Sequence, residues 1–400
     1  MNGHSPVIPA DSASPATSHR LSWQAVWRAY QTASVAVFLK PAGGRGGLSF
    51  GVRQCTRLER TQDLEAVTGA ALERAEGERV AFLMAFQPDS CRGLWRGLPP
   101  GLVLVPGQWV PAPGEWPQQS GPEMAAWRPL RSRLRPEHAD WADRVRRTTA
   151  AISAGQIDKV VLARRLDLTY DHPIDVPGTV AELVRGNQAA TVWSWRVGGQ
   201  DFVGASPELL VSYRQGRLQT ACLAGTLIDG AVGDGGAWRD KERREQAVVE
   251  SYVDRAFRTL GLTPVHSALS EVHQGSFRHL TATVEAKADS ASSFYALLTL
   301  LHPTPALAGE PRSEALQWIR RQEPFGRGYY GGVVGWAEAT GEAHAVVAIR
   351  CALLSGPKAH LFAGGGLVRG SEPDAEWQET GAKLRVVQGA LERGGADGWR

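Results

Sequence analysis

Two pairs of glutamates share one spacing, and each pair stands where a helix is expected to begin. Glu242 and Glu245 lie in the segment DKERREQAVVE, and Glu376 and Glu379 lie in DAEWQETGAK. Residues three apart share a helix face, so each pair forms one small carboxylate patch. Either pair alone has an ordinary explanation, because acidic side chains are common in the first turn of a helix. Two pairs that faced each other would repel unless a hard cation such as Mg²⁺ lay between them.

Three further charged residues stand in apolar or turn-like surroundings. Lys159 opens the segment KVVLARR, and Glu208 follows a Ser-Pro turn in FVGASPELL. Lys159 is either an ordinary strand-end lysine in water or a lysine desolvated enough to act as a base, and Glu208 has the pattern of an ordinary turn acid. Arg350 lies in the apolar segment VVAIRCALL and needs a partner, which is either a structural ion pair or a carboxylate ligand. The glycines of AGGGLV offer N–H groups to an anion, although they do not match G-x-G-x-x-G.

Helices and strands alternate through the last two thirds of the chain. Apolar spacing predicts helices over 138–155 and 240–260, and a last helix from near Ser371. The strand-like segments include KVVLARRLDL, GGVVGWAEA, HAVVAIRCALL and HLFAGGGLV, and FVGASPELLVSY is expected to form two strands around its Ser-Pro turn. This mixture predicts a single α/β (α+β) domain over 21–400. The Ser-, Pro- and Ala-rich residues 1–20 are predicted to be a disordered tail.

Composition excludes several classes of protein. The chain has 400 residues, of which 43% are hydrophobic and 21% charged, and its formal net charge is +3. Basic residues form no block, which argues against a nucleic-acid partner. No apolar run reaches membrane-spanning length, so no membrane association is expected. The four cysteines contain no C-x-x-C, which favours a reduced, cytoplasmic protein.

Ten segments together resemble the motifs of the chorismate-utilising enzymes, and within them those of the isochorismate synthases. They occur in the family order over roughly 150–390, and such an ordered set is far more specific than one motif. The segments are KVVLARR, FVGASPELL, LAGT, DKERREQAVV, the His-Leu pair at 279–280, LHPTPALAG, EPFGRGYYGGVVGW, AIRCA, FAGGGLV and EPDAEWQETGAKL. One departure is Gln246, which stands where the family commonly has a histidine; that position is not a metal ligand.

The resemblance implies a fold and a site. The fold would be a single chorismate-binding domain in which antiparallel β-sheets pack as a sandwich core surrounded by helices. The two acidic pairs would converge on Mg²⁺, with Glu245 and Glu379 as direct ligands and Glu242 and Glu376 acting directly or through water. The positions that match the family's substrate-binding residues are Gly225, Thr226, His279, Ala306, Tyr330, Ile349, Arg350, Gly364, Gly366 and Lys383.

The implied activity is the isomerisation of chorismate to isochorismate, in which water adds at ring C2 and the C4 hydroxyl leaves. Water is a poor nucleophile and hydroxide a poor leaving group, so the reaction needs a base and an acid. Lys159 matches the family's general base, which must be neutral, and Glu208 matches its general acid, which must be protonated. Desolvation shifts both kinds of group in the required direction.

Related activities on the same scaffold stay open. Anthranilate synthases usually lack the lysine at position 159, and aminodeoxychorismate synthases carry a nucleophilic lysine where this chain has Ala224. Salicylate synthases go on to eliminate pyruvate, and they tend to carry a threonine near Ala306. We therefore expect an isochorismate synthase that feeds menaquinone or catecholate siderophore biosynthesis. We also expect a monomer that needs no amidotransferase subunit.

Overall fold

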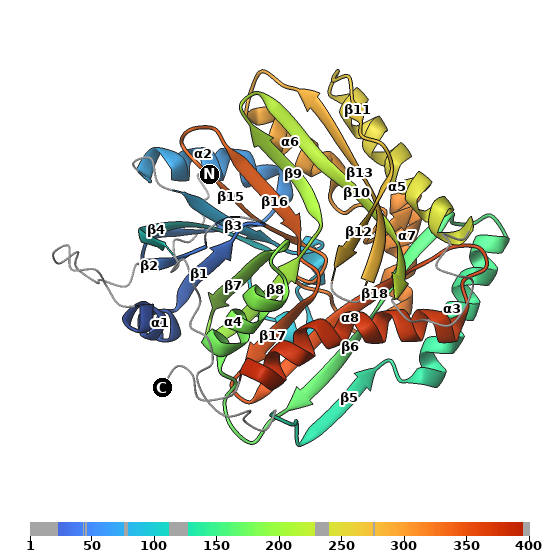
Figure 1. The fold of residues 1–400 in the computed structure, drawn as a ribbon, viewed down its shortest axis with the longest axis horizontal. Coiled ribbons are helices and arrows are strands. Elements are labelled where there is room, and N and C mark those ends of the chain that lie inside the picture. Colours follow the sequence, from blue (N-terminus) through green and yellow to red (C-terminus); the bar gives the residue numbers. More distant parts are fainter. Residues whose placement is uncertain are drawn as a thin grey trace, which may run out of the picture.

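All strands that the structure describes belong to one sheet. The computed structural model describes residues 23–42, 44, 46–75, 79–111, 127–228, 240–274 and 277–394. Within these ranges the sheet has 18 strands, and every pairing is antiparallel. The tail predicted over 1–20 lies outside the described residues. Helices lie on the outside of the sheet (Figure 1).

The pairings divide the sheet into two halves. The first half runs through β6 (Lys159–Thr169), β18 (Lys358–Leu367), β17 (Cys351–Ser355), β8 (Gln200–Ser206), β7 (Thr191–Val197) and β1 (Val35–Lys40). At its edge, β6 also pairs with β5 (Arg131–Arg135) and with the short β14 (Gly309–Glu310). This half carries the predicted segments of Lys159 and of the glycine run.

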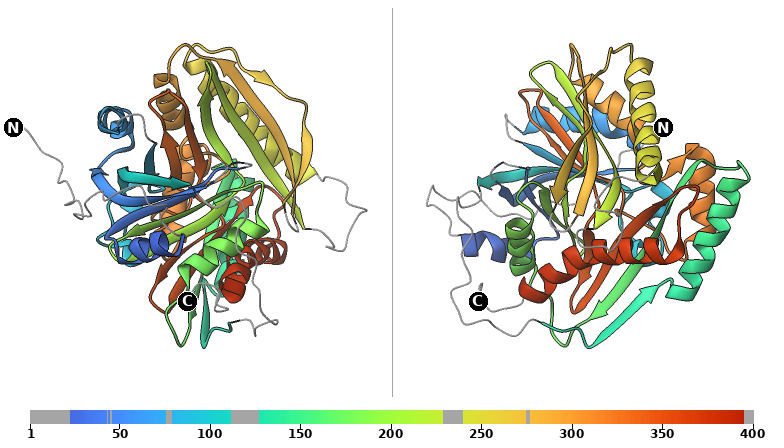
Figure 2. Two further views of the ribbon diagram at one scale, coloured as in Figure 1. Left: turned by 60° about the vertical axis from the view of Figure 1, so that its left-hand side comes forward. Right: turned by 45° about the vertical axis from the view of Figure 1, so that its right-hand side comes forward.

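The second half continues from β1 through its pairing with β2. It runs through β2 (Gly47–Leu58), β4 (Gly101–Pro111), β3 (Val80–Met84), β15 (Val333–Ala337), β16 (Ala343–Val347), β9 (Leu209–Arg214), β10 (Arg217–Ile228) and β13 (Phe277–Lys287). Its edge is formed by β11 (Val265–His266) and β12 (Ser270–Gln274), which both pair with β13. Figure 2 shows the long β10 and β13 strands extending away from the blue strands of the N-terminal region.

The two halves pack face to face. Successive side chains of a strand point to opposite faces, so each strand between two layers contributes to two clusters. In β3, Ala81 and Leu83 join the cluster between the halves, whereas Phe82 and Met84 join the cluster under the helices. The inner cluster combines side chains of both halves, such as Trp195 of β7 and others from β4, β15 and β18. The predicted sandwich core is thereby confirmed.

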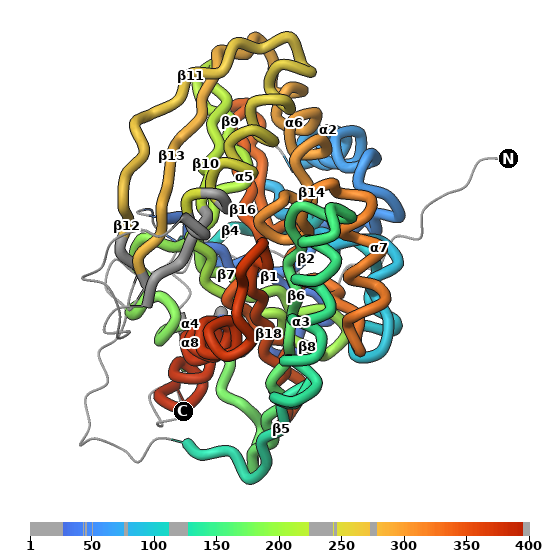
Figure 3. The backbone as a smooth tube through the Cα atoms, turned by 90° about the vertical axis from the view of Figure 1, so that its right-hand side faces the viewer, coloured from blue at the N-terminus to red at the C-terminus, as the bar shows by residue number. Residues whose placement is uncertain are grey.

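Helices cover both outer faces. The first half is covered by α1 (Trp23–Thr32), α4 (Val176–Gly186) and α8 (Pro373–Gly394). The second half and the start of β6 are covered by α2 (Leu64–Arg74), α3 (His138–Ser153), α5 (Asp240–Thr259), α6 (Ser292–Leu301) and α7 (Arg312–Gln322). Figure 3 shows α2, α3 and α7 along one side of the molecule. The predicted helices over 138–155, over 240–260 and from near Ser371 correspond to α3, α5 and α8.

One predicted strand is wrong. The apolar segment HAVVAIRCALL predicts a single strand, but the structure divides it into β16 and β17. Strand β16 pairs in the second half and β17 in the first, so Ala348–Arg350 carries the chain from one half to the other. Arg350 has a φ of 50°, a left-handed conformation that interrupts an extended strand. A continuous apolar run carries no local sign of such a crossing.

The inner face also yields a stability prediction. Gly204 of β8 lies between Trp193 of β7 and Cys351 of β17, and a Cβ atom there would lie 2.3 Å from Trp193 Cζ2. We expect Gly204→Ala to lower the free energy of unfolding by about 1–3 kcal/mol, because an overpacked core must shift. Gly69→Ala in α2 is the control, since its Cβ meets nothing within 4 Å. Urea unfolding measures both, and equal stability of the two variants would contradict the packing.

Candidate active site

The candidate site lies where the chain crosses between the two halves of the sheet. Strand β8 pairs in the first half and β9 in the second, so Pro207 and Glu208 form one crossing. The segment ending at Arg350 forms another. Backbone hydrogen bonds join the two crossings: Ala205 N donates to Arg350 O over 3.1 Å, and Val347 N donates to Glu208 O over 3.1 Å. The sheet therefore places an acid and a cation from distant segments side by side.

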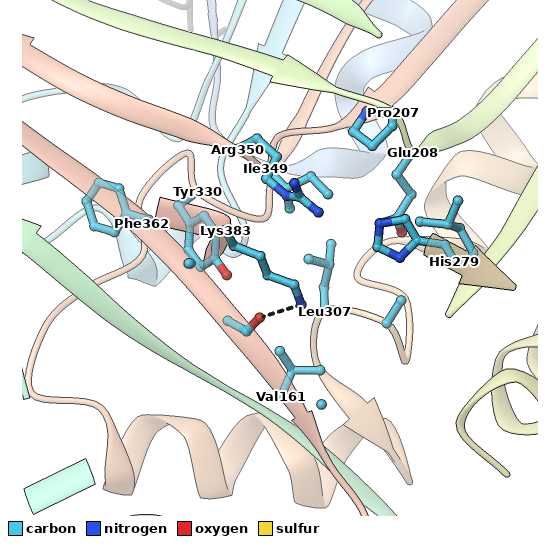
Figure 4. Close-up of a pocket in the computed structure, with 15 residues that line it drawn as sticks. Val161, Pro207, Glu208, His279, Leu307, Tyr330, Ile349, Arg350, Phe362 and Lys383 are labelled. Carbon is cyan, nitrogen blue, oxygen red and sulfur yellow. Dashed lines mark hydrogen bonds between the residues drawn. The ribbon is translucent and has the colours of Figure 1, made fainter. Parts of the chain in front are cut away.

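A cavity opens at these crossings, and its empty space, counted together with the part that is open to solvent, is about 670 Å³. Figure 4 shows Arg350, Lys383 and Tyr330 on one side of it and Glu208 and His279 on the other. The predicted residues that line it are Glu208, His279, Ala306, Tyr330, Ile349, Arg350, Gly364, Gly366 and Lys383. The remaining lining residues, which sequence reasoning did not single out, are Val161, Pro207, Leu223, Leu307, Phe362 and Ala363. All of these additional residues lie within the family motifs quoted above, so their position in those motifs could have identified them.

Arg350 makes this end of the cavity electropositive. Its side chain is buried, and burial lowers the pKa of Arg350 to about 10, while the nearby Glu379, Glu208 and Tyr330 act in the opposite direction. The guanidinium is therefore charged at neutral pH. Its left-handed backbone lies in a region that non-glycine residues rarely adopt, and such strain is concentrated at functional sites. The side chain lines the cavity and also feels the charges of Glu379 and Glu208, so both interpretations from the sequence stay open.

Helix α8 contributes a second cation. Lys383 Nζ donates to Gly364 O of β18 over 3.1 Å and to Glu379 Oε1 over 2.6 Å. The amine thus bridges the helix and the strand at the wall of the cavity. Tyr330 completes this wall: its ring stacks on Phe362 with centroids 5.5 Å apart, and burial raises the pKa of the Tyr330 hydroxyl, which is therefore protonated at neutral pH.

The glycine run of β18 is needed for close approach. A Cβ at Gly364 would lie 2.6 Å from the Tyr330 hydroxyl, and a Cβ at Gly365 would lie 2.8 Å from Glu376 Oε2. Glu376 is fully buried at this contact. A larger residue at position 364 would displace the Tyr330 hydroxyl, and one at position 365 would displace the Glu376 carboxylate. The run therefore leaves room for both groups beside β18.

Lys159 is buried beside the cavity and does not line it. It is the first residue of β6, is 0% exposed, and pairs with Glu310 of β14. Residues two apart on a strand share a face, so Lys159 lies on the same face as Val161, which does line the cavity. The ordinary interpretation of Lys159 as a strand-end lysine in water is wrong, because its side chain is excluded from water.

Four predicted residues cannot be placed as side chains. Glu242 and Glu245 lie on α5, and Gly225 and Thr226 lie on β10, but their side chains fall outside the described residues. The backbone of β10 is irregular there, because the register with β13 shifts between Ala224 and Thr226. Bulges of this kind are frequent next to active sites. Whether the acidic pairs meet therefore stays a prediction.

The glutamates of α8 are suited to a hard cation. Glu376 and Glu379 lie one turn apart, and both face β18 and the cavity wall, through the contacts to Gly365 and to the Lys383 ammonium. Carboxylate oxygens are the donors that Mg²⁺ prefers. Among the side chains that the structure describes, no group of three or more His, Cys, Asp or Glu residues forms a metal site. A complete site would need the glutamates of α5.

These features define the class of protein, and the comparisons agree. The family model described as "Chorismate binding enzyme" matches residues 117–392, and the chain belongs to this family. The predicted resemblance is confirmed. Within the described helices, none is long and apolar enough to cross a membrane.

The relatives point to one branch of the family. The chain is 35% identical over 268 residues to "Isochorismate synthase MenF" of Bacillus subtilis, a match that covers 63% of this chain and 55% of that protein. It is also 35% identical over 263 residues to "Isochorismate synthase EntC" of Escherichia coli, covering 63% and 67%. The match thus spans little more than half of the first relative's length.

Solved structures share the whole fold. The chain matches a structure described as a putative 2,3-dihydroxybenzoate-specific isochorismate synthase, DhbC, from Bacillus anthracis, with 25% identity and a TM-score of 0.77 over 92% of this chain and 100% of that one. It matches MenF, the menaquinone-specific isochorismate synthase from Escherichia coli, with 25% identity and a TM-score of 0.75 over 96% and 94%. The likeness includes the N-terminal strands, which carry few family motifs.

Proposed function

We propose that the protein is an isochorismate synthase, which converts chorismate to isochorismate. The observation that carries this proposal is the cavity that joins Glu208, Arg350, Tyr330 and Lys383 beside the buried Lys159. Chorismate is a dianion, and fixed cations with oriented donors are what a buried dianion requires. The relatives' names support the same reaction.

The residues have distinct roles in this reaction. Lys159 acts as the base that takes a proton from the water adding at C2, and Glu208 acts as the acid that protonates the departing C4 hydroxyl. One water is consumed and one is released, while the two ring double bonds shift, so the reaction is an isomerisation. Arg350 and Lys383 hold the substrate carboxylates, and Tyr330 donates its hydroxyl hydrogen.

Magnesium is part of the proposal. Glu376 and Glu379 would hold the ion together with Glu242 and Glu245. When bound, it supplies positive charge for a carboxylate of the substrate. The residues of this chain perform the proton transfers.

Product analysis tests the proposal. Purified protein is incubated with chorismate and Mg²⁺, with and without ammonium, and products are separated by chromatography and identified by mass spectrometry. Isochorismate as the main product under both conditions is expected. Salicylate with pyruvate would establish the elimination alternative, anthranilate formed with ammonium would establish the amine-using alternative, and no product at all would reject every enzymatic proposal.

The physiological context belongs to the same proposal. Isochorismate would serve either menaquinone or catecholate siderophore biosynthesis, and relatives of both kinds resemble the chain. The protein would act in the cytoplasm as a monomer, without an amidotransferase subunit, because water supplies the nucleophile. Sedimentation of the purified protein would test the oligomeric state.

Arg350 offers a test of substrate binding. We expect Arg350→Gln to raise KM for chorismate roughly 10–100-fold, because a hydrogen bond to a charged group contributes about 1.5–3 kcal/mol. Steady-state kinetics measures KM and kcat, and Arg214→Gln on the exposed surface of β9 is the control. An unchanged KM would mean that Arg350 serves only the neighbouring carboxylates.

A further inference from the structure

A buried ion pair lies behind the wall of the cavity. Glu323 follows the end of α7, and its Oε2 accepts a hydrogen bond from Arg327 Nε over 2.9 Å. The two side chains are 3% and 2% exposed. Burial by itself lowers the pKa of Arg327, but the charge and hydrogen bonds of Glu323 outweigh it, so the pKa is raised. Arg327 is therefore charged, although neither member of the pair lines the cavity.

The pair joins three segments that form the cavity. Arg327 Nη1 donates to Leu307 O over 2.7 Å, and Arg327 Nη2 donates to Val161 O over 2.7 Å. Glu323 Oε1 accepts from Ala163 N of the same strand over 2.8 Å, and Tyr330 N donates to Arg327 O over 3.0 Å. Leu307, Val161 and Tyr330 all line the cavity. A single pair thus fixes the backbone of three wall segments, including the strand that Lys159 opens.

The geometry requires arginine in particular. The planar fork of the guanidinium donates four hydrogen bonds, two to Glu323 and one to each of two backbone carbonyl groups. Its carbon Cζ also lies 4.4 Å from the Phe86 ring centroid and 5.7 Å from the Tyr330 ring centroid. A lysine ammonium is a point charge that cannot reproduce this fork. A buried ion pair contributes little to stability compared with apolar residues of similar volume. Its stability contribution therefore does not account for its presence beside the cavity.

We propose that Glu323 and Arg327 are positioning residues of the active site, which hold β6, the segment around Leu307 and the segment around Tyr330 in the arrangement needed for turnover. This inference rests on the proposed function for its kinetic consequence, although the geometric part stands without it. A misplacement of about 1 Å can lower a rate roughly 100-fold. The pair thus acts on the reaction through the walls that it holds.

The test compares two Arg→Lys substitutions. Arg327→Lys keeps the charge and removes the fork. The control is Arg79→Lys, because Arg79 also makes two hydrogen bonds to one glutamate, Glu338, at 3.0 and 2.6 Å, and joins the ends of β3 and β15 away from the cavity. Both variants are assayed well below their melting temperatures. We expect Arg327→Lys to lose roughly 10–100-fold in kcat/KM, mainly in kcat, and Arg79→Lys to keep wild-type kinetics.

Hydrogen exchange gives a readout that does not depend on turnover. In the protein without substrate, Arg327→Lys should accelerate amide exchange in peptides covering 159–163, 305–309 and 328–332, whereas Arg79→Lys should leave these peptides unchanged. If the wild type does not convert chorismate, the proposed function fails, but exchange still decides the positioning role. Should Arg327→Lys not fold, Glu323→Gln takes its place, because it keeps an acceptor for Ala163 N.

Two results would overturn the inference. One is wild-type kcat/KM and wild-type exchange in the folded Arg327→Lys variant. The other is an equal loss of kcat/KM in Arg327→Lys and Arg79→Lys. Such a result would show that disruption of any similar arginine–glutamate pair lowers turnover, wherever the pair lies.

Discussion

Lys159→Ala and Glu208→Gln should each lower the turnover of chorismate by roughly 10²–10⁴-fold, the usual contribution of a general acid or base. Chorismate binding should survive, because in the proposed site the cations that would hold its carboxylates are Arg350 and Lys383. Both substituted residues are buried, at 0% and 7% exposure, so bulk water is largely excluded from their side chains. The measurement is single-turnover kinetics with saturating chorismate, so that binding and chemistry are separated.

The controls test position as well as residue type. Lys358 opens β18 as Lys159 opens the neighbouring β6, but Lys358 is exposed, so Lys358→Ala should keep wild-type turnover. Circular dichroism verifies that each variant is folded. A folded Lys159→Ala variant with near wild-type kcat would remove Lys159 from the role of base, and the same outcome for Glu208→Gln would remove the acid.

Glu379→Gln should abolish most of the activity and also the stabilisation by Mg²⁺. Removal of a residue that only hydrogen-bonds to a metal ligand lowers activity roughly 10–100-fold. The loss of activity in Glu379→Gln should be larger, because Glu379 would be a direct ligand. In the wild type, Mg²⁺ at about 100 times its Kd should stabilise the fold by about 2.7 kcal/mol. This shift is a readout that does not depend on the reaction.

Glu379→Gln also removes the ionic partner of Lys383, so a matched control variant is needed. Glu372→Gln, at an exposed position just before α8, should keep both the activity and the Mg²⁺-dependent shift. Thermal unfolding with and without Mg²⁺ is compared for the three proteins, together with turnover in EDTA. Full wild-type activity in excess EDTA would refute the metal, and a wild-type Mg²⁺ shift in Glu379→Gln would refute Glu379 as a ligand.

The family, the kind of fold and most of the residues that line the cavity were predictable from the amino-acid sequence. Apolar periodicity located α3, α5 and α8, because a helix face repeats within one short segment. The Ser-Pro turn divided β8 from β9, because turn residues act locally. The ordered motifs brought together residues as distant as Glu208 and Lys383, although only by resemblance.

The places where the chain crosses between the halves of the sheet depend on packing between distant segments. The crossing at Ala348–Arg350 lies inside an apolar run, because the residues on either side of it are buried in different halves. The ion pair of Glu323 and Arg327 was likewise missed, since charged residues around Pro324 and Gly326 are typical of an exposed turn until their burial is known. Close approach across β18 and the burial of Lys159 depend on packing between distant segments, and no local pattern of residues encodes that packing.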